Sequence, residues 1–201
     1  MKAIVELKNA TKVVTNGFNE ERVILDKVNL TIYQGDFITI LGGNGAGKST
    51  LFNVIAGTLP LTSGSVHILG EDVTNWPAEK RAKYLARVFQ DPKMGTSPRM
   101  TVAENLLIAK YRGEGRGLVP RKLSQQKEEF AQLLPRVGNG LEKHLETPAG
   151  LLSGGQRQAL SLLMASLKQP ELLLLGEHTA ALDPKTAKKV LEITQEIVKE
   201  Q

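Results

Sequence analysis

Gly42-Gly43-Asn44-Gly45-Ala46-Gly47-Lys48-Ser49 decides the fold of this 201-residue chain, because it fits the phosphate-binding pattern G-x-x-x-x-G-K-[ST]. The apolar run 37–41 precedes it and a helical pattern begins at Lys48, so we expect a loop between a strand and a helix. In such a loop the backbone N–H groups and the helix dipole face a triphosphate. Lys48 is predicted to reach the β- and γ-phosphates, Ser49 to ligate Mg²⁺, and Thr50 to complete the site.

Composition places this loop in a cytoplasmic protein. With 41% hydrophobic residues the chain can bury one core, and it has no cysteine for disulfides or thiolate metal sites. No apolar run reaches the length of a membrane span, and the first ten residues are too charged for a secretory signal. The net charge of +5 is modest and does not by itself indicate a nucleic-acid partner.

Strand signals surround the loop and indicate two kinds of sheet. The early runs alternate in hydropathy, which is typical of an antiparallel sheet with one wet face. The run of leucines at 172–175 is continuous, which is typical of a parallel strand covered on both faces. The predicted strands are residues 4–7, 28–32, 37–41, 66–69, 87–89 and 171–175.

Helical signals replace strand signals between Gly95 and Gly150. Thr101 and Glu104 form a capping box that predicts a helix over 102–110, and a second helix is predicted over 124–134, stopped by Pro135. We therefore predict one domain over 1–201. Its α/β core and antiparallel β subdomain comprise 1–94 and 151–201, and a helical subdomain comprises 95–150.

A second motif, Leu152-Ser153-Gly154-Gly155-Gln156, opens an apolar helix. In isolation it could be an ordinary serine N-cap. It lies upstream of the leucine strand, which ends in Gly176-Glu177, and of Asp183-Pro184, where Asp183 caps and Pro184 opens a last predicted helix. The motif therefore has two interpretations: a serine that caps the helix, or a functional helix N-terminus that acts together with the phosphate loop.

The order of these motifs resembles that of the ATP-binding subunits of ABC transporters over nearly the whole chain. The resemblance implies a P-loop NTPase fold in which two such subunits pair head to tail. ATP then lies between the phosphate loop of one subunit and Ser153, Gly154, Gly155 and Gln156 of the other. It also implies that Gln90 contacts Mg²⁺ and the attacking water, that Glu177 is the catalytic acid, and that Asp183 communicates across the dimer.

Three features depart from the family pattern. Gly176 stands where an aspartate normally holds Mg²⁺ through its water shell, and glycine brings no carboxylate. The C-terminal strands and the histidine that would follow the last helix are missing from 1–201. The usual adenine-stacking aromatic is replaced by Val14, for which Phe18 is the nearest substitute.

The function that these observations predict is a Mg²⁺-dependent ATPase that powers solute transport through a separate permease. We expect a homodimer peripheral to the cytoplasmic face of the membrane, in a bacterial importer with an extracytoplasmic substrate-binding protein, and no nucleic acid. Residues 95–104 are expected to form part of the surface that docks a permease helix. Two alternatives stay open: a catalytically weakened ATP-binding subunit, for which Gly176 argues, and a soluble ABC ATPase acting on ribosomes or DNA.

Overall fold

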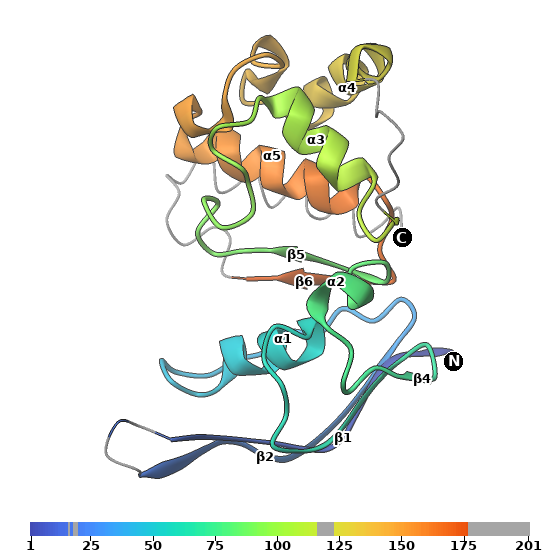
Figure 1. Cartoon of the computed structure of the whole chain (residues 1–201), viewed down its shortest axis with the longest axis vertical. Coiled ribbons are helices and arrows are strands. Elements are labelled where there is room, and N and C mark those ends of the chain that lie inside the picture. The colour runs from blue at the N-terminus through green and yellow to red at the C-terminus, as the bar shows by residue number, and fades with distance from the viewer. Residues whose placement is uncertain (16, 18–19, 116–122, 177–201) are drawn as a thin grey trace. The chain divides into compact units, whose positions relative to one another are not determined.

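The computed structural model of the chain describes residues 1–15, 17, 20–115 and 123–176 (Figure 1). It contains two compact units, Met1–Leu85 and Ala86–Gln201, and each is described by itself. Within the described residues no helix is both long and apolar enough to cross a membrane. The predicted division between a core and a helical insertion at 95–150 stays a prediction.

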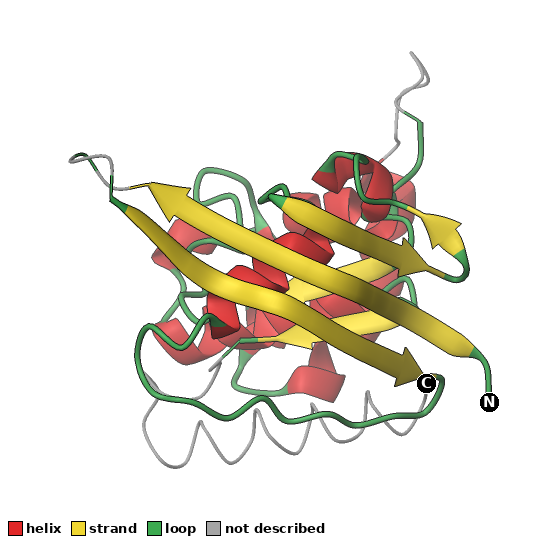
Figure 2. Ribbon diagram, turned by 90° about the horizontal axis from the view of Figure 1, so that it is seen from below, coloured by secondary structure: helices red, strands yellow, loops and turns green. Residues whose placement is uncertain are grey.

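An antiparallel sheet of four strands dominates the first unit, in the order β2-β1-β3-β4 (Figure 2). β1 and β2 pair along their whole length, from Ala3 with Tyr33 to Thr15 with Glu21. The early alternating runs thus form the antiparallel sheet that the sequence predicts, although two of the strands are much longer than expected. The strands are β1 Ala3–Thr15, β2 Glu21–Tyr33, β3 Ser63–Ile68 and β4 Glu71–Asp72.

Two helices complete the first unit, α1 Lys48–Ala56 and α2 Ala78–Arg81. α1 begins inside the phosphate-binding pattern, at the residue where the helical pattern of the sequence begins. Four of its apolar residues, Leu51, Val54, Ile55 and Ala56, are buried, as are residues of the sheet. The buried residues of this unit include Ile4, Val5, Leu7, Leu51, Val54, Ile55, Val66 and Ile68.

The strand predicted at 37–41 is not formed, which corrects the sequence analysis. These residues belong to no strand or helix, and Phe37 and Leu41 are 73% and 87% exposed. A strand needs hydrogen-bonded neighbours, and the sheet of the first unit contains only β1 to β4. The apolar composition of 37–41 therefore predicted a strand, but these residues do not pair with the sheet of their own unit.

A two-stranded parallel sheet lies in the second unit except for its first residue, Leu85; its strands are β5 Leu85–Val88 and β6 Leu172–Leu175. Helix α5, Gly154–Ser166, packs Leu162 and Ala165 against this pair, whose inward residues include Ala86 and Val88. Parallel pairing of the leucine run confirms the predicted strand type.

Three helices of the second unit enclose a separate apolar core (Figure 1). α3 Val102–Lys110 begins at the predicted capping box, and α4 is Leu123–Val137. α3, α4 and α5 contact one another, and two short 3-10 turns, Leu141–Lys143 and Ala149–Leu151, connect α4 to α5. Central to the core are Leu106, Phe130, Leu134, Leu141 and Leu160.

Pro135 does not stop α4 where the sequence predicts. The helix continues two residues beyond it, to Val137, and Gly138 follows with a positive φ of 62°. Proline removes the N–H that would donate to the carbonyl four residues earlier, so it weakens the last turn, but only two helical residues follow it. The end of the helix is set by Gly138 rather than by the proline.

Candidate functional site

The phosphate-binding pattern forms a loop that ends in left-handed glycines. Gly45 and Gly47 have φ angles of 80° and 85°, a conformation that other residues rarely adopt. At Gly47 an added Cβ would also lie 3.0 Å from the main-chain oxygen of Ile24. Gly47 is the N-cap of α1, it offers no side chain to cap the helix, and the first turn contains no acid. This helix terminus is therefore suited to an anionic ligand.

Lys48 spans the loop from the first residue of α1. Its Nζ donates to the main-chain oxygens of Gly42 and Gly43, at 2.5 Å and 3.1 Å. The ammonium group is thus held across the first half of the loop. Ser49 is exposed and Thr50 half-buried in the first turn of the same helix, and Asn44 and Ala46 are exposed in the loop. All the predicted phosphate-loop residues therefore gather at one end of α1.

A buried arginine that the sequence analysis missed holds the opposite end of α1. Arg81 Nη1 donates to the main-chain oxygens of Val54 and Ile55 at 2.8 Å and 2.9 Å. Its Nη2 and Nε donate to the oxygens of Thr74 and Trp76 at 3.0 Å and 3.1 Å. Burial lowers the pKa of Arg81 from its ordinary value. The four hydrogen bonds compensate the cost of burying the guanidinium group. Two of them attach Arg81 to the last turn of α1, the helix that carries Lys48.

The second motif forms a capped helix N-terminus. Ser153 Oγ accepts from the N–H of Gln156 at 3.3 Å, and Gln156 Oε1 accepts from the N–H of Ser153 at 3.1 Å. Gly154 faces open space, with no atom within 4 Å of where its Cβ would stand. Ser153 is exposed and Gly155 half-buried. The structural interpretation as a serine N-cap is therefore correct, and it leaves an accessible glycine at the first turn.

Gln156 also ties this helix terminus to a tight turn. Its Nε2 donates to the main-chain oxygen of Asn139 at 3.1 Å. Gly138, Asn139 and Gly140 have positive φ angles of 62°, 58° and 72°. The side chain of Gln156 therefore makes two hydrogen bonds, one to the helix cap at Ser153 and one to the turn at Asn139. This side chain is consequently held in one orientation.

Gln90 and Gly176 meet where β5 and β6 end. Gln90 is exposed and follows β5, and the N–H of Gly176 donates to the main-chain oxygen of Val88 at 2.9 Å. A Cβ at position 176 would lie 3.0 Å from the main-chain nitrogen of Gln90 and 3.2 Å from the oxygen of Val88. The absent side chain therefore allows close main-chain packing next to a predicted catalytic residue.

The residues fit a nucleoside triphosphate better than they fit a metal ion. Glycines, Lys48 and an uncapped helix terminus suit phosphate oxygens. For Mg²⁺, the described candidates are the Ser49 hydroxyl and the Gln90 amide, and Gly176 brings no carboxylate. No group of three or more acids and histidines that could hold a metal occurs among residues 1–15, 17, 20–115 and 123–176.

The structure brings together some of the predicted site residues. The phosphate loop lies in the first unit, whereas Gln90, Gly176 and the Ser153 end of α5 lie in the second. Gln90 and Gly176 are neighbours, as described above. The predictions for Phe18, Glu177 and Asp183 concern residues outside the described ranges.

Comparisons with known proteins agree on one family. The model of the family described as ABC transporter matches residues 25–180. A tyrosine transport ATP-binding protein of Clostridioides difficile is 43% identical over 98% of this chain and 78% of its own length. A spermidine/putrescine import ATP-binding protein of Haemophilus ducreyi is 39% identical over 94% of this chain. The chain spans only 46% of that second relative.

Solved structures of ATP-binding cassettes resemble nearly the whole chain. A dimeric post-hydrolysis state of an ATP-binding cassette bound to ADP and Pi matches with a TM-score of 0.80 and 28% identity, over 98% of this chain and 84% of the other. A nucleotide-free ATP-binding cassette from an ABC transporter matches with a TM-score of 0.77, also at 28% identity, over 98% and 78% of the two chains. The chain thus resembles cassettes solved with ADP and Pi and without nucleotide.

Proposed function

The chain belongs to the ABC transporter family, and from that premise we propose that it is the ATP-binding subunit that powers solute import through a separate permease. The observation that carries the proposal is the loop at the start of α1, where Lys48 braces two main-chain oxygens above an uncapped helix N-terminus. This arrangement supplies N–H groups and a cation for a triphosphate. The names of the relatives favour an importer over an ATPase that acts on ribosomes or DNA.

ATP binding is proposed to join two copies of the chain. The phosphate loop of one copy would hold the β- and γ-phosphates through Lys48, and the exposed Ser153 and Gly154 of the other would face the γ-phosphate. Both helix termini lack an acid in their first turn, which suits an anion between them. The dimeric cassette bound to ADP and Pi supports this pairing.

Hydrolysis is proposed to use Glu177 to polarise water and Gln90 with Ser49 to hold Mg²⁺, the ion that neutralises charge on the transferred phosphoryl group. The missing carboxylate at Gly176 should weaken this step, because Mg²⁺ in such sites is normally bound through one or two carboxylates. We therefore propose that the chain binds ATP fully and hydrolyses it slowly.

Replacing Gly176 with aspartate should raise Mg²⁺-dependent ATP turnover at least about tenfold, because one preorganised charge stabiliser is typically worth a few kcal/mol. ATP affinity should change far less, since the phosphate loop is untouched. The measurement is steady-state ATPase activity at saturating Mg²⁺, in the product of the full gene. Adding Glu177→Gln should abolish the gain.

Gly176→Asn is the matched control for this gain. Asparagine introduces the same Cβ, 3.0 Å from the Gln90 nitrogen, and nearly the same shape without the charge. Any displacement of Gln90 therefore affects both variants, and only the carboxylate separates them. Equal turnover of the glycine, asparagine and aspartate proteins would show that position 176 does not limit catalysis.

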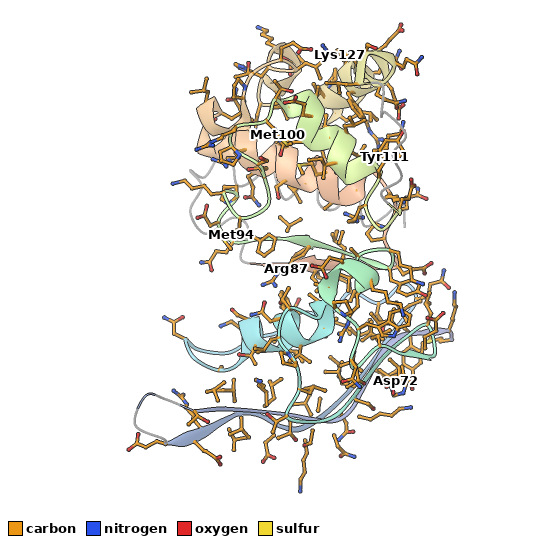
Figure 3. The ribbon with its side chains drawn as sticks, in the orientation of Figure 1. Asp72, Arg87, Met94, Met100, Tyr111 and Lys127 are labelled. Carbon is orange, nitrogen blue, oxygen red and sulfur yellow. The ribbon has the colours of Figure 1, made fainter. Side chains whose placement is uncertain are left out.

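The permease is proposed to dock on the exposed residues between β5 and α3. Arg99 is exposed, Met100 is 37% exposed, and Met94 lies on the same loop (Figure 3). An exposed methionine beside a cation suits an amphipathic helix of a membrane protein. The loop directly follows Gln90, so a docked permease could sense the nucleotide site.

Met100→Asp should lower solute uptake at least about fivefold in vesicles that contain the permease, because a charge would be buried at the docking surface. ATP binding should stay within about twofold. Lys127→Ala is the control, since Lys127 lies on α4 in an exposed ion pair with Glu146 at 2.8 Å. Full uptake by Met100→Asp, or co-purification of the chain with ribosomes instead of a permease, would refute this placement.

Amino acids are the solute class we propose, together with an extracytoplasmic binding protein that delivers them. Two relatives are named for tyrosine transport and methionine import, the latter in Corynebacterium efficiens at 38% identity. The subunit itself would lie at the cytoplasmic face of the membrane, held there by the permease. Uptake of labelled tyrosine, methionine and spermidine by the reconstituted complex distinguishes these classes.

A further inference from the structure

A buried hydrogen bond ties the loop after Gln90 to helix α5. Arg157 Nε donates to Thr96 Oγ1 at 2.6 Å, and the two residues are 7% and 8% exposed. The same hydroxyl donates to the main-chain oxygen of Pro92 at 3.1 Å. One threonine thus joins a side chain of α5 to the backbone two residues beyond Gln90. A charged donor makes this bond stronger than a neutral one.

The loop touches α5 at a second point, one helical turn further along. A Cβ on Gly95 would lie 2.7 Å from Ser161 Oγ, and Ser161 is buried. Ser161 follows Arg157 by four residues, so both contacts lie on one face of the helix. Gly95 therefore packs directly against α5 beside the hydrogen bond of Thr96.

Helix α3 holds the other end of the loop. The buried Asn105 accepts from the N–H of Ser97 at 2.8 Å and donates to the main-chain oxygens of Ser97, Met100 and Thr101 at 3.1, 3.2 and 2.9 Å. Residues 92–101 are consequently fastened at Pro92, at Gly95 and along 97–101.

We propose that Arg157 and Thr96 are positioning residues that make the loop after Gln90 and the Ser153 end of α5 move as one body. Displacement of the exposed loop residues by a permease then reaches Ser153 and Gly154 through one buried contact. The inference rests on the proposed function, in which Ser153 faces ATP and the loop faces the permease.

The test compares four proteins: wild type, Thr96→Ser, Thr96→Val and the double variant Thr96→Val/Arg157→Met. Serine keeps the hydroxyl. Valine alone removes it and leaves Arg157 buried without its acceptor, which endangers folding. The double variant replaces both partners with apolar groups, so it removes the link with the least cost to stability. Unchanged hydrogen exchange of the buried turns of α3 verifies that each variant is folded.

Hydrogen exchange of the isolated chain is the first readout. We expect the amides of 93–96 to exchange about tenfold faster in the double variant than in wild type, while Thr96→Ser stays within about twofold. The second readout is solute stimulation of ATP hydrolysis in the permease complex. It should fall at least about fivefold in the double variant, with basal hydrolysis and the KM for ATP within about twofold, a pattern that simple destabilisation does not produce.

Wild-type exchange at 93–96 and wild-type stimulation in the double variant would overturn the inference. Faster exchange with intact stimulation would also overturn it, because the link would then be structural only. If wild type itself showed no solute stimulation, the proposed function would fail. The exchange result, which needs no permease, would still decide whether Arg157 and Thr96 fasten the loop.

Discussion

Replacing Lys48 with alanine is expected to weaken ATP binding at least about 100-fold, equivalent to about 2.8 kcal/mol. Lys48 is the cation built into the phosphate loop, and charge-assisted hydrogen bonds to phosphate are the strongest that a side chain makes. It also braces the loop by donating to Gly42 and Gly43 at 2.5 Å and 3.1 Å. Its removal therefore costs both a ligand contact and the order of the loop. Isothermal titration calorimetry with ATP measures the loss.

Lys8→Ala is the matched control for this loss. Lys8 lies on β1 of the same unit in an exposed ion pair with Glu6 at 3.5 Å, and its removal lowers the net charge equally. ATP affinity should stay within about twofold in this variant. Lys48→Arg should recover only part of the binding. The planar guanidinium group is larger than an ammonium group and directs its N–H donors differently. An unchanged affinity for Lys48→Ala would refute the assignment of the loop.

Replacing Arg81 with leucine is expected to lower the free energy of unfolding by about 3 kcal/mol, because four main-chain carbonyl oxygens, two of them buried, lose the guanidinium donor. Two of them, on Val54 and Ile55, belong to the last turn of α1. The Val54 oxygen also accepts from the N–H of the C-cap residue Gly57 at 3.2 Å, so the Ile55 oxygen is the one that depends more on Arg81. The measurement is urea unfolding followed by circular dichroism, with the midpoint expected to fall and the slope to stay constant.

Two further variants make the arginine prediction specific. Glu79→Ala changes an exposed residue of the same short helix and should cost less than about 0.5 kcal/mol. Arg81→Lys keeps the charge but cannot reach four carbonyls in a fixed fork, so it should recover less than half of the loss. A loss below 1 kcal/mol for Arg81→Leu would show that solvent replaces these hydrogen bonds.

The sequence by itself determined the features that depend on neighbours within one turn of chain. The start of α1 at Lys48, the capping box that begins α3 and the serine N-cap that begins α5 all lie where the sequence predicts. The two helix caps are stabilised by contacts three residues apart, and Lys48 reaches back five and six residues within the loop, so a short stretch of sequence contains both partners of each interaction. The family followed from the order of these motifs.

Only the tertiary structure decided the contacts between segments far apart in the chain. Arg81 caps a helix that ends some 25 residues earlier, and Arg157 reaches Thr96 across 61 positions. The apolar run 37–41 forms no strand, since pairing depends on a neighbouring strand rather than on composition. Side-chain hydrogen bonds of this kind leave no periodicity, so a buried arginine and an exposed one look identical in sequence.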